Sequence, residues 1–323
     1  MVYNEKYKML FEIIEQKEMI KNIPEKLDVQ LVNVISKIKN SDIIYLTGSG
    51  TSFHACQFLQ ILLNKSEINS IAIPASEFHY WFNGKAHNNS LLIIFSQSGE
   101  SVDAINALNM GKSLGLYTIG VTNENKSKLY NESDYGLSTC SGHEEALAAT
   151  KSHSAQLLLG LEIYSIINNN KIDYDSIDFN YILNDLEKIK NLSLQLRKYI
   201  IFLGSGILYP IAMEGSLKMK ETSVTISEGY ATREFLHGPM EILDNNFTII
   251  LLDDHDEEEN KIKNFGSNII KISVNSKDFN IKNGNELVSI FEYLMVIQLL
   301  AYFHSINKGL DPDHPDKLNK IVK

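Results

Sequence analysis

The chain has 323 residues, of which 44% are hydrophobic, and a formal net charge of −10. This length suits two α/β domains, and the hydrophobic content is sufficient for a sizeable core. The acidic balance argues against nucleic acid as the main partner, although a loop of backbone N–H groups can still hold a phosphate locally.

The two cysteines, Cys56 and Cys140, provide neither a disulfide framework nor zinc-ligand spacing, and we expect buried thiols. The N-terminus lacks an apolar signal stretch. The longest apolar stretches, near 157–167 and 293–303, are interrupted by polar residues and are shorter than the roughly 20 residues that span a bilayer. We therefore expect a soluble cytoplasmic protein.

Residues 5–40 are predicted to be helical, with charged and apolar positions interleaved. Apolar, β-rich runs then alternate with helical segments. The predicted strands lie at 43–46, 70–73, 91–95 and 117–121, with helices near 52–64 and 102–114. This alternation indicates a parallel sheet covered on both faces.

A polar stretch at 168–195 shows no core pattern and is predicted to contain the domain boundary. Residues 1–175 would form an N-terminal helix plus the first domain, and residues 176–323 a second domain with a C-terminal tail.

An internal duplication supports this division. Residues 200–206 repeat the pattern of residues 44–50, and the runs at 248–252 and 269–274 repeat the later strands. We therefore predict an α/β fold of two tandem doubly wound, flavodoxin-like domains with parallel sheets. Such folds bind ligands at the carboxyl ends of their strands.

One candidate site directly follows the strand at 91–95. Residues 96–101 contain three serines, a glutamine and a glycine at the start of a helix. Free N–H groups and the helix dipole favour an anion there, and serine hydroxyls can donate to phosphate oxygens. The same residues would also suit a simple capped turn, with serine as N-cap and Glu100 in the first turn.

A second hydroxyl-rich loop, residues 48–52, follows the first strand and also precedes a helix. Its spacing is not the dinucleotide fingerprint, and the lysine of a P-loop is missing. Two such loops at adjacent strand ends indicate a small phosphorylated, hydroxylated ligand.

The second half carries an acid–base candidate in the predicted helix around 214–221. Glu214, Lys218 and Glu221 are spaced by four and three residues, so they share one helix face. Most such runs are solvated ion pairs. Flanking methionines and Leu217 suggest partial burial instead, where a carboxylate and an amine can tune each other for proton transfer.

A histidine in the same half is the next candidate. His237 precedes a Gly-Pro turn and is predicted to lie on a loop. A lone histidine is more often structural, but this loop setting favours a functional role.

Taken together, these motifs resemble the sugar isomerase (SIS) family, in particular the isomerase half of glucosamine-6-phosphate synthase and free-standing glucosamine-6-phosphate deaminases. The resemblance runs in order from about residue 7 to the end of the chain. The matching stretches are 48–55, 75–78, 96–101, 148–151, 214–221, 236–239 and 313–320.

The resemblance implies roles for individual residues. The sugar phosphate would be bound by Gly50, Thr51, Ser52, Ser96, Gln97, Ser98 and Ser101, and by the backbone of Leu147 and Ala148. Glu221, supported by Lys218, would move a proton between C1 and C2. His237 would open the sugar ring from the neighbouring subunit, so the resemblance implies a homodimer. Lys320 resembles the lysine that meets the open-chain carbonyl, although by sequence alone it is a terminal lysine.

The chain departs from the family pattern around residues 143–149. Leu147 replaces the usual valine, Ala149 a serine, Ala146 a glycine, and His143 a common proline. These changes concern the pocket for the sugar substituent more than the proton transfer. A glutaminase domain and a cysteine after Met1 are also missing, so we expect that the chain does not make ammonia from glutamine by itself.

The leading functional prediction is a hexosamine 6-phosphate isomerase and deaminase that needs no cofactor and no metal. Three alternatives remain open: a deglycase of phosphorylated sugar–amino-acid adducts, the isomerase subunit of a two-chain synthase, and a non-catalytic sugar-phosphate sensor. We expect no nucleic-acid or membrane partner.

Two further motifs are predicted to be structural. The acidic run 253–259 suggests a metal site, but a solvated loop and helix start is the expected structure. The Asp-Pro-Asp-His-Pro turn at 311–315 is expected to be a rigid lead into the tail.

Overall fold

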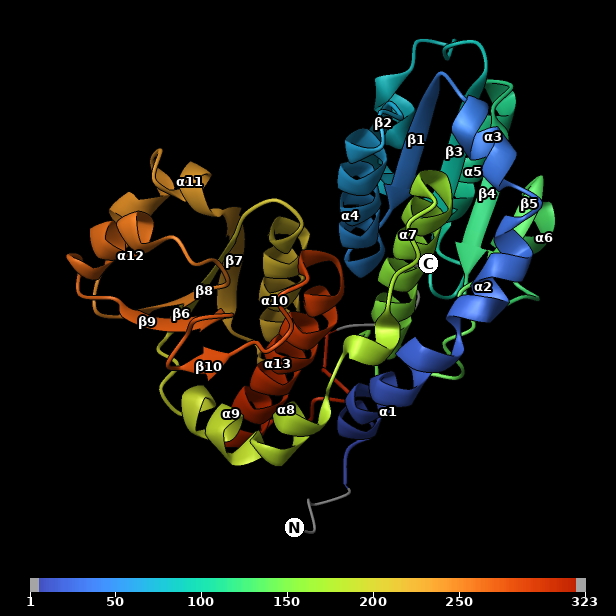
Figure 1. The fold of residues 1–323 in the computed structure, drawn as a ribbon. Coiled ribbons are helices and arrows are strands. Elements are labelled where there is room, and N and C mark those ends of the chain that lie inside the picture. Colours follow the sequence, from blue (N-terminus) through green and yellow to red (C-terminus); the bar gives the residue numbers. More distant parts are fainter. Residues whose placement is uncertain (1–5, 318–323) are drawn as a thin grey trace. The chain divides into compact units, whose positions relative to one another are not determined.

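The computed structural model describes residues 6–317. These residues divide into two compact units. The first-sheet unit comprises residues 16–144 and 151–172, and the second-sheet unit comprises residues 6–15, 145–150 and 173–317. Each unit is built around its own parallel five-stranded sheet (Figure 1). The predicted pair of doubly wound sheets is therefore confirmed.

The first-sheet unit follows the predicted alternation of strands and helices. Its strands are β1 (Ile43–Gly48), β2 (Ser70–Pro74), β3 (Ser90–Phe95), β4 (Tyr117–Thr122) and β5 (Tyr135–Ser138). Its helices are α2 (Pro24–Leu31), α3 (Ile35–Asn40), α4 (Thr51–Lys65), η1 (Ala75–Trp81), α5 (Val102–Ser113), α6 (Lys128–Glu132) and α7 (Lys151–Asn168). All five strands are parallel, in the flavodoxin-like order β2-β1-β3-β4-β5.

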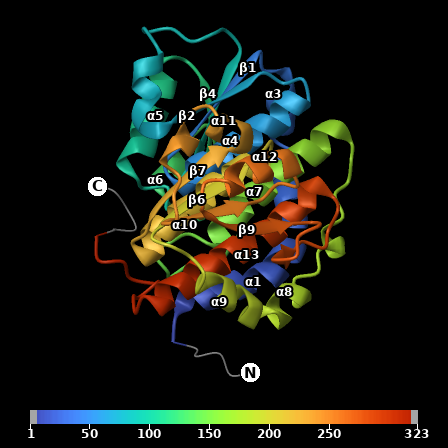
Figure 2. The ribbon, with the colours of Figure 1, turned by 90° about the vertical axis from the view of Figure 1, so that its left-hand side faces the viewer.

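The second-sheet unit repeats this topology. Its strands are β6 (Tyr199–Gly204), β7 (Ile226–Ala231), β8 (Phe247–Leu251), β9 (Asn268–Ser273) and β10 (Phe279–Asn280), in the order β7-β6-β8-β9-β10. Its helices are η2 (Tyr174–Ser176), α8 (Asn180–Asn184), α9 (Leu186–Ser193), α10 (Leu208–Ser223), α11 (Thr232–Phe235), η3 (Pro239–Ile242), α12 (Asp256–Lys263) and α13 (Glu286–Asn307). The predicted duplication is thus visible in the strand order. Figures 1 and 2 show the ribbon in two views.

Helix α1 (Lys8–Asn22) contributes residues to both units. The predicted helical stretch at 5–40 is divided into α1, α2 and α3, and α2 begins at Pro24. Proline is tolerated at the first turn of a helix because its missing N–H would have no partner there.

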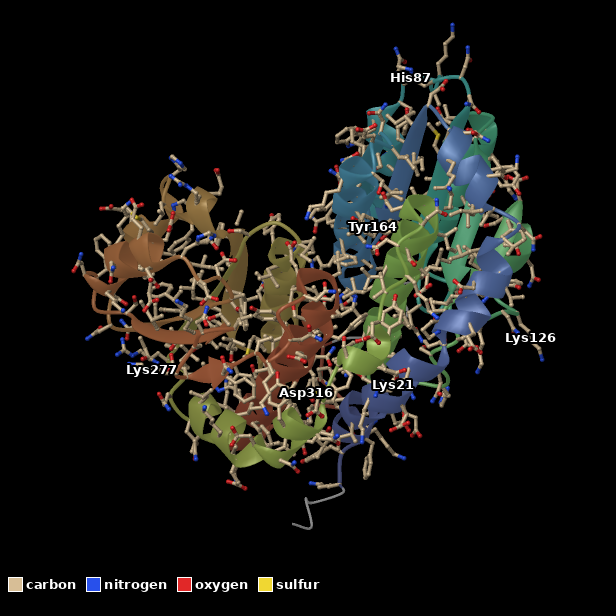
Figure 3. All side chains as sticks on the ribbon, in the orientation of Figure 1. Lys21, His87, Lys126, Tyr164, Lys277 and Asp316 are labelled. Atoms are coloured by element: carbon tan, nitrogen blue, oxygen red, sulfur yellow. The ribbon has the colours of Figure 1, made fainter. Side chains whose placement is uncertain are left out.

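The core of each unit consists of strands that are buried along nearly their whole length. Five of the six residues in each of β1, β3, β4 and β6 are buried, as expected where helices cover both faces of a parallel sheet. Charged side chains lie mainly at the surface, and Figure 3 marks His87, Lys126 and Lys277 among the exposed residues.

Two expectations were wrong, one about the length of an apolar segment and one about the absence of a core pattern in a polar segment. The stretch at 293–303 belongs to α13, whose 22 residues are long and apolar enough to span a membrane; 94% of its most apolar window is buried, as in a core helix. The boundary region 168–195 does have a core pattern, because α9 buries Leu186, Ile189 and Leu192 along one face.

The cysteines differ from each other. Cys56 is fully buried, and burial raises the pKa of its thiol well above the ordinary value. Cys140 is only half-buried, so the expectation of two buried thiols holds for Cys56 alone.

Candidate active site

The two hydroxyl-rich loops are neighbours at the carboxyl edge of the first sheet. In the parallel register of β1 and β3, Gly48 lies opposite Phe95. The loops that follow, 49–52 and 96–101, therefore leave the sheet at the same level, and each leads into a long helix, α4 or α5. This edge is where doubly wound sheets bind their ligands.

Helices α4 and α5 both begin without a side-chain cap. Gly50 is the N-cap of α4 and Ser101 is the N-cap of α5, and neither makes a side-chain cap hydrogen bond. A capped turn was the structural alternative for residues 96–101, with Glu100 in the first turn of α5. Glu100 instead accepts from the backbone N–H of Lys128 at the start of α6, at 2.7 Å. The expected capped turn is therefore not formed, and anion binding by this loop stays a prediction.

Hydrogen bonds within the loop 96–101 fix its shape. The Ser96 hydroxyl accepts from the backbone N–H of Gly99 at 3.1 Å and lies 3.5 Å from the Ser101 hydroxyl. The Ser98 hydroxyl accepts from the N–H of Glu100 at 3.2 Å. The Gln97 carbonyl accepts from the Thr122 hydroxyl at 3.1 Å. These bonds organise the loop before any ligand arrives.

Gly99 is required by this geometry. Its φ is +65°, and a Cβ atom there would lie only 2.1 Å from the Ser127 hydroxyl. Any other residue would have a strained backbone, and its Cβ atom would force the loop and the Ser127 side chain apart.

Ser52 has a buried partner that the sequence did not suggest. The side-chain amide of Gln156, on α7, donates to the Ser52 hydroxyl at 3.0 Å. Both side chains are buried, at 2% and 7% exposure. Because the amide occupies an acceptor position of Ser52, it leaves the Ser52 proton free to be donated elsewhere.

The acid–base candidates lie on α10 in the second-sheet unit. Lys218 is fully buried, and its ammonium group lies 3.3 Å from the carboxylate of Glu214 and forms a short ion pair with Glu221. Glu214 is also fully buried, whereas the Glu221 side chain is 19% exposed. The cluster is therefore not a solvated helix face, and Glu221 is the member that reaches solvent.

The charge of Lys218 follows from these contacts. Burial alone would lower the pKa of its ammonium group, but the carboxylates of Glu214 and Glu221 outweigh burial and raise this pKa above its ordinary value. These contacts favour the charged form of Lys218 beside the two carboxylates.

The remaining predicted residues also belong to the second-sheet unit or lie beyond the described residues. His237 is exposed on the turn after α11, which agrees with its predicted loop position. In the loop 145–150, Ala148 is buried, and the backbone N–H of Leu147 donates to the carbonyl of Asp313 at 3.1 Å. Lys320 lies outside the described residues.

The acidic run that follows β8 is partly buried, contrary to expectation. Asp253 is only 6% exposed, and its carboxylate accepts from the Ser205 backbone N–H at 3.0 Å and from the Ser205 hydroxyl at 2.9 Å. The Thr232 hydroxyl makes a further short bond to it. Asp253 thus ties together the ends of β6, β7 and β8, while α12 begins after it.

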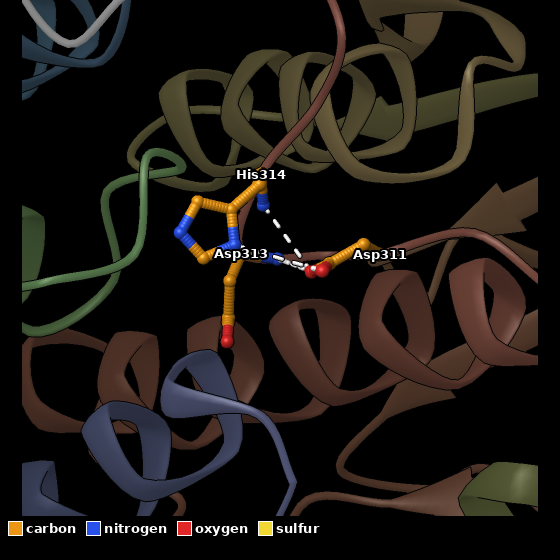
Figure 4. A group of neighbouring side chains, drawn as sticks. All are labelled: Asp311, Asp313 and His314. Carbon is orange, nitrogen blue, oxygen red and sulfur yellow. Dashed lines mark hydrogen bonds and ion pairs between the residues drawn. The ribbon is translucent and has the colours of Figure 1, made fainter.

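The side chains of Asp311, Asp313 and His314 are close enough together to consider a metal (Figure 4). Asp311 accepts from the backbone N–H groups of Asp313 at 2.9 Å and His314 at 3.3 Å, which closes the turn. The Asp313 carboxylate is directed toward α1, where it accepts two backbone N–H groups. This arrangement matches the predicted rigid turn.

Comparison with known proteins identifies the family. The SIS domain model matches residues 37–164 and 193–266. The chain belongs to the SIS domain family. It is 32% identical to a glutamine–fructose-6-phosphate aminotransferase of Sulfurisphaera tokodaii, over 97% of this chain and 56% of that protein. It is 34% identical to the same enzyme of Buchnera aphidicola, over 96% and 57%. The chain therefore spans about half the length of these curated relatives.

Solved structures show the same fold over almost the whole chain. The C-terminal domain of the Francisella tularensis glucosamine-fructose-6-phosphate aminotransferase matches with a TM-score of 0.82 and 25% identity, covering 97% of this chain and 99% of that one. The glucosamine-6-phosphate deaminase of Thermotoga maritima matches with a TM-score of 0.79 and 26% identity, covering 98% and 99%. The chain is thus related to sugar-phosphate isomerases.

Proposed function

We propose that this protein interconverts glucosamine 6-phosphate and fructose 6-phosphate with release or uptake of free ammonia. The observation that carries this proposal is the buried Lys218 beside a partly exposed Glu221, because a carboxylate held next to a fixed cation suits proton transfer between neighbouring carbons. The hydroxyl groups at the carboxyl edge of the first sheet are a second argument, because they favour a phosphorylated substrate. We also propose that the protein acts in the cytoplasm.

The proposed reaction begins with ring opening. His237 transfers a proton from the C1 hydroxyl to the ring oxygen, and the C–O bond of the ring breaks to give the open-chain aldehyde. The loops 49–52 and 96–101 hold the phosphate of the substrate.

Proton transfer and hydrolysis follow. Glu221 removes the proton from C2 and returns it to C1, while one proton of the C2 amine passes to the C1 oxygen, so that the aldehyde becomes an alcohol and the amine at C2 becomes an imine. One water molecule adds to the imine and ammonia leaves, which gives fructose 6-phosphate. Lys218 holds the Glu221 carboxylate in position through their ion pair before and after the transfer. Lys320 would meet the open-chain carbonyl, as the family resemblance implies.

The decisive experiment measures ammonia and fructose 6-phosphate after incubation of the protein with glucosamine 6-phosphate. Formation of both products in equal amounts is expected. No turnover of this substrate, together with turnover of an amino-acid adduct of the sugar phosphate, would reject the proposal in favour of a deglycase. Binding of sugar phosphate without turnover of either compound would favour a sensor.

A second candidate is the isomerase part of a glutamine-dependent synthase. It is favoured by the curated relatives, because the chain matches about half of each. The two candidates differ in their nitrogen source. Synthesis of glucosamine 6-phosphate from fructose 6-phosphate and ammonium chloride by the chain alone supports the first candidate. Synthesis only after a separate glutaminase and glutamine are added supports the second.

We further propose that the working unit is a homodimer in which His237 acts on the substrate of the neighbouring subunit. The exposed position of His237 on a turn supports this role. Mixing inactive Glu221→Gln and His237→Asn subunits tests it, because only a mixed dimer then contains one intact site. Activity of about one quarter of the wild type is expected for random pairing of the two subunits. No recovery in a mixture shown to contain mixed dimers would contradict the proposal.

A further inference from the structure

Three segments that are distant in sequence meet at the start of α1 in the second-sheet unit: the first turn of α1, the loop 145–147 and the segment around Asp313. Asp313 is 3% exposed, and its carboxylate accepts from the backbone N–H groups of Lys8 at 2.7 Å and Met9 at 2.8 Å. These residues begin α1, and the first N–H groups of a helix have no partner within it. Asp313 therefore caps α1 from the opposite end of the chain.

The same helix holds the loop through Glu12, which is 5% exposed. One carboxylate oxygen of Glu12 accepts from the backbone N–H groups of Glu145 and, at 3.3 Å, Ala146. The next N–H, that of Leu147, donates to the Asp313 carbonyl at 3.1 Å. Three consecutive backbone amides of the loop are thus held, two by the Glu12 carboxylate and one by the backbone carbonyl of Asp313. Moving the loop would leave buried polar groups without partners, which is costly.

We propose that Glu12 and Asp313 are positioning residues that fix the backbone of Leu147 and Ala148 for the substrate and anchor the chain segment that carries Lys320. This inference rests on the proposed function, which places that backbone and Lys320 at the sugar. Because the Leu147 N–H is already bonded to Asp313, the backbone group that Leu147 can offer the substrate is its carbonyl.

The two residues should affect different kinetic constants. Glu12→Ala releases part of the loop that binds the sugar before and during the reaction, so KM should rise about tenfold while kcat stays within about twofold. Asp313→Ala releases the anchor of the segment that carries Lys320, so kcat should fall about tenfold with a smaller change in KM.

Conservative variants separate geometry from charge. Glu12→Gln keeps an oxygen that can accept the two loop amides, so it should restore KM to within about twofold of the wild type. Glu18→Ala serves as the matched control, because Glu18 lies on the same helix and is 71% exposed in a 3.9 Å ion pair with Lys17. It should leave both constants unchanged.

Amide hydrogen exchange tests the network without any substrate. In the wild type, amides 145–147 should exchange more slowly than the exposed residues 142 and 143. In Glu12→Ala, amides 145 and 146 should exchange at least about tenfold faster, with no such change in Glu18→Ala. Unprotected amides in the wild type would overturn the network, and this holds even if a variant does not fold.

The outcomes also separate this inference from the proposed function. Absence of turnover by the wild type, with protected amides, would count against the proposed function only. Faster exchange in a folded Glu12→Ala variant with unchanged KM and kcat would overturn the positioning role only. An equal rise of KM in Glu12→Gln and Glu12→Ala would show that the hydrogen bonds from amides 145 and 146 to Glu12 do not position the loop.

Discussion

The carboxyl edges of the two sheets have the same backbone but opposite chemistry. The turn after β1 contains Gly50 with a φ of +53°, and the corresponding turn after β6 contains Gly206 with a φ of +58°. The register of the strands places Phe95 opposite Gly48 and Leu251 opposite Leu203. One residue beyond, Leu252 aligns with Gly204, so that Asp253 takes the position that Ser96 has in the first sheet.

The presence of Asp253 in place of a serine explains why the first edge is the better candidate for binding phosphate. Helix starts at both edges lack side-chain caps, but only at the first edge do hydroxyl groups of the following loops face no carboxylate of the kind that Asp253 provides, which suits an anion from outside. At the second edge, the carboxylate of Asp253 already accepts the N–H and hydroxyl groups of Ser205. An anion supplied by the chain itself stabilises the second half, and a phosphate there would meet its negative charge.

The largest expected effect concerns Glu221 as the catalytic base. Glu221→Gln keeps the shape of the side chain but cannot take up a proton, so kcat should fall by about 10³-fold, or about 4 kcal/mol. Binding of sugar phosphate should change little, as measured by calorimetry. Glu228→Gln is the control, because Glu228 is exposed and pairs only loosely with Lys220 at 3.6 Å. Near wild-type activity of Glu221→Gln would remove Glu221 from its role.

The next effect tests the structural role of the second edge. Asp253→Ala leaves the partly buried donors of Ser205 and the buried hydroxyl of Thr232 without their acceptor, so the free energy of unfolding should fall by about 2–4 kcal/mol. Urea unfolding measures this change, and Asp256→Ala, at an 86% exposed position, is the control. A loss of sugar-phosphate affinity without loss of stability would break the comparison between the two edges.

A smaller effect tests the binding role of the first edge. Ser101→Ala removes a hydroxyl that makes no cap hydrogen bond with α5, so stability should change by less than about 0.5 kcal/mol. Affinity for the sugar phosphate should fall about tenfold, or about 1.4 kcal/mol. Titration calorimetry compares this variant with Ser113→Ala, a serine at the other end of α5. Unchanged affinity would show that the Ser101 hydroxyl does not contact the ligand.

The smallest effect concerns Glu292, a buried carboxyl group of the second half whose state depends on pH. Burial raises the pKa of Glu292 above its ordinary 4.5, against hydrogen bonds from Tyr181 and the backbone of Asn283 and Lys282 that lower it. The folded protein therefore binds this proton more tightly than the unfolded chain. The resulting stabilisation is complete below about pH 4.5 and is lost as the pH rises through the higher folded pKa.

Glu292→Gln removes this titration. The stability of the variant relative to the wild type should therefore improve as the pH rises from 4 toward 7, as measured by urea unfolding at several pH values. A difference that stays constant, or changes in the opposite direction, would contradict the raised pKa.

The sequence by itself determined the alternation of strands and helices, the duplication and the two hydroxyl-rich loops. These features depend on local patterns: apolar runs for buried strands, and glycine with serine at helix starts. Glu214, Lys218 and Glu221 could also be placed on one face of a helix, because their spacing alone fixes that.

Only the tertiary structure decided which polar residues are buried and what they contact. Asp253 and Asp256 look alike in the acidic run, yet one is a buried acceptor and the other is exposed. Gln156, Glu12 and Asp313 gained their roles from partners more than 100 residues away in the chain. The physical reason is that a hydrogen bond to a distant backbone leaves no periodic trace in sequence, whereas burial of an amphipathic face does.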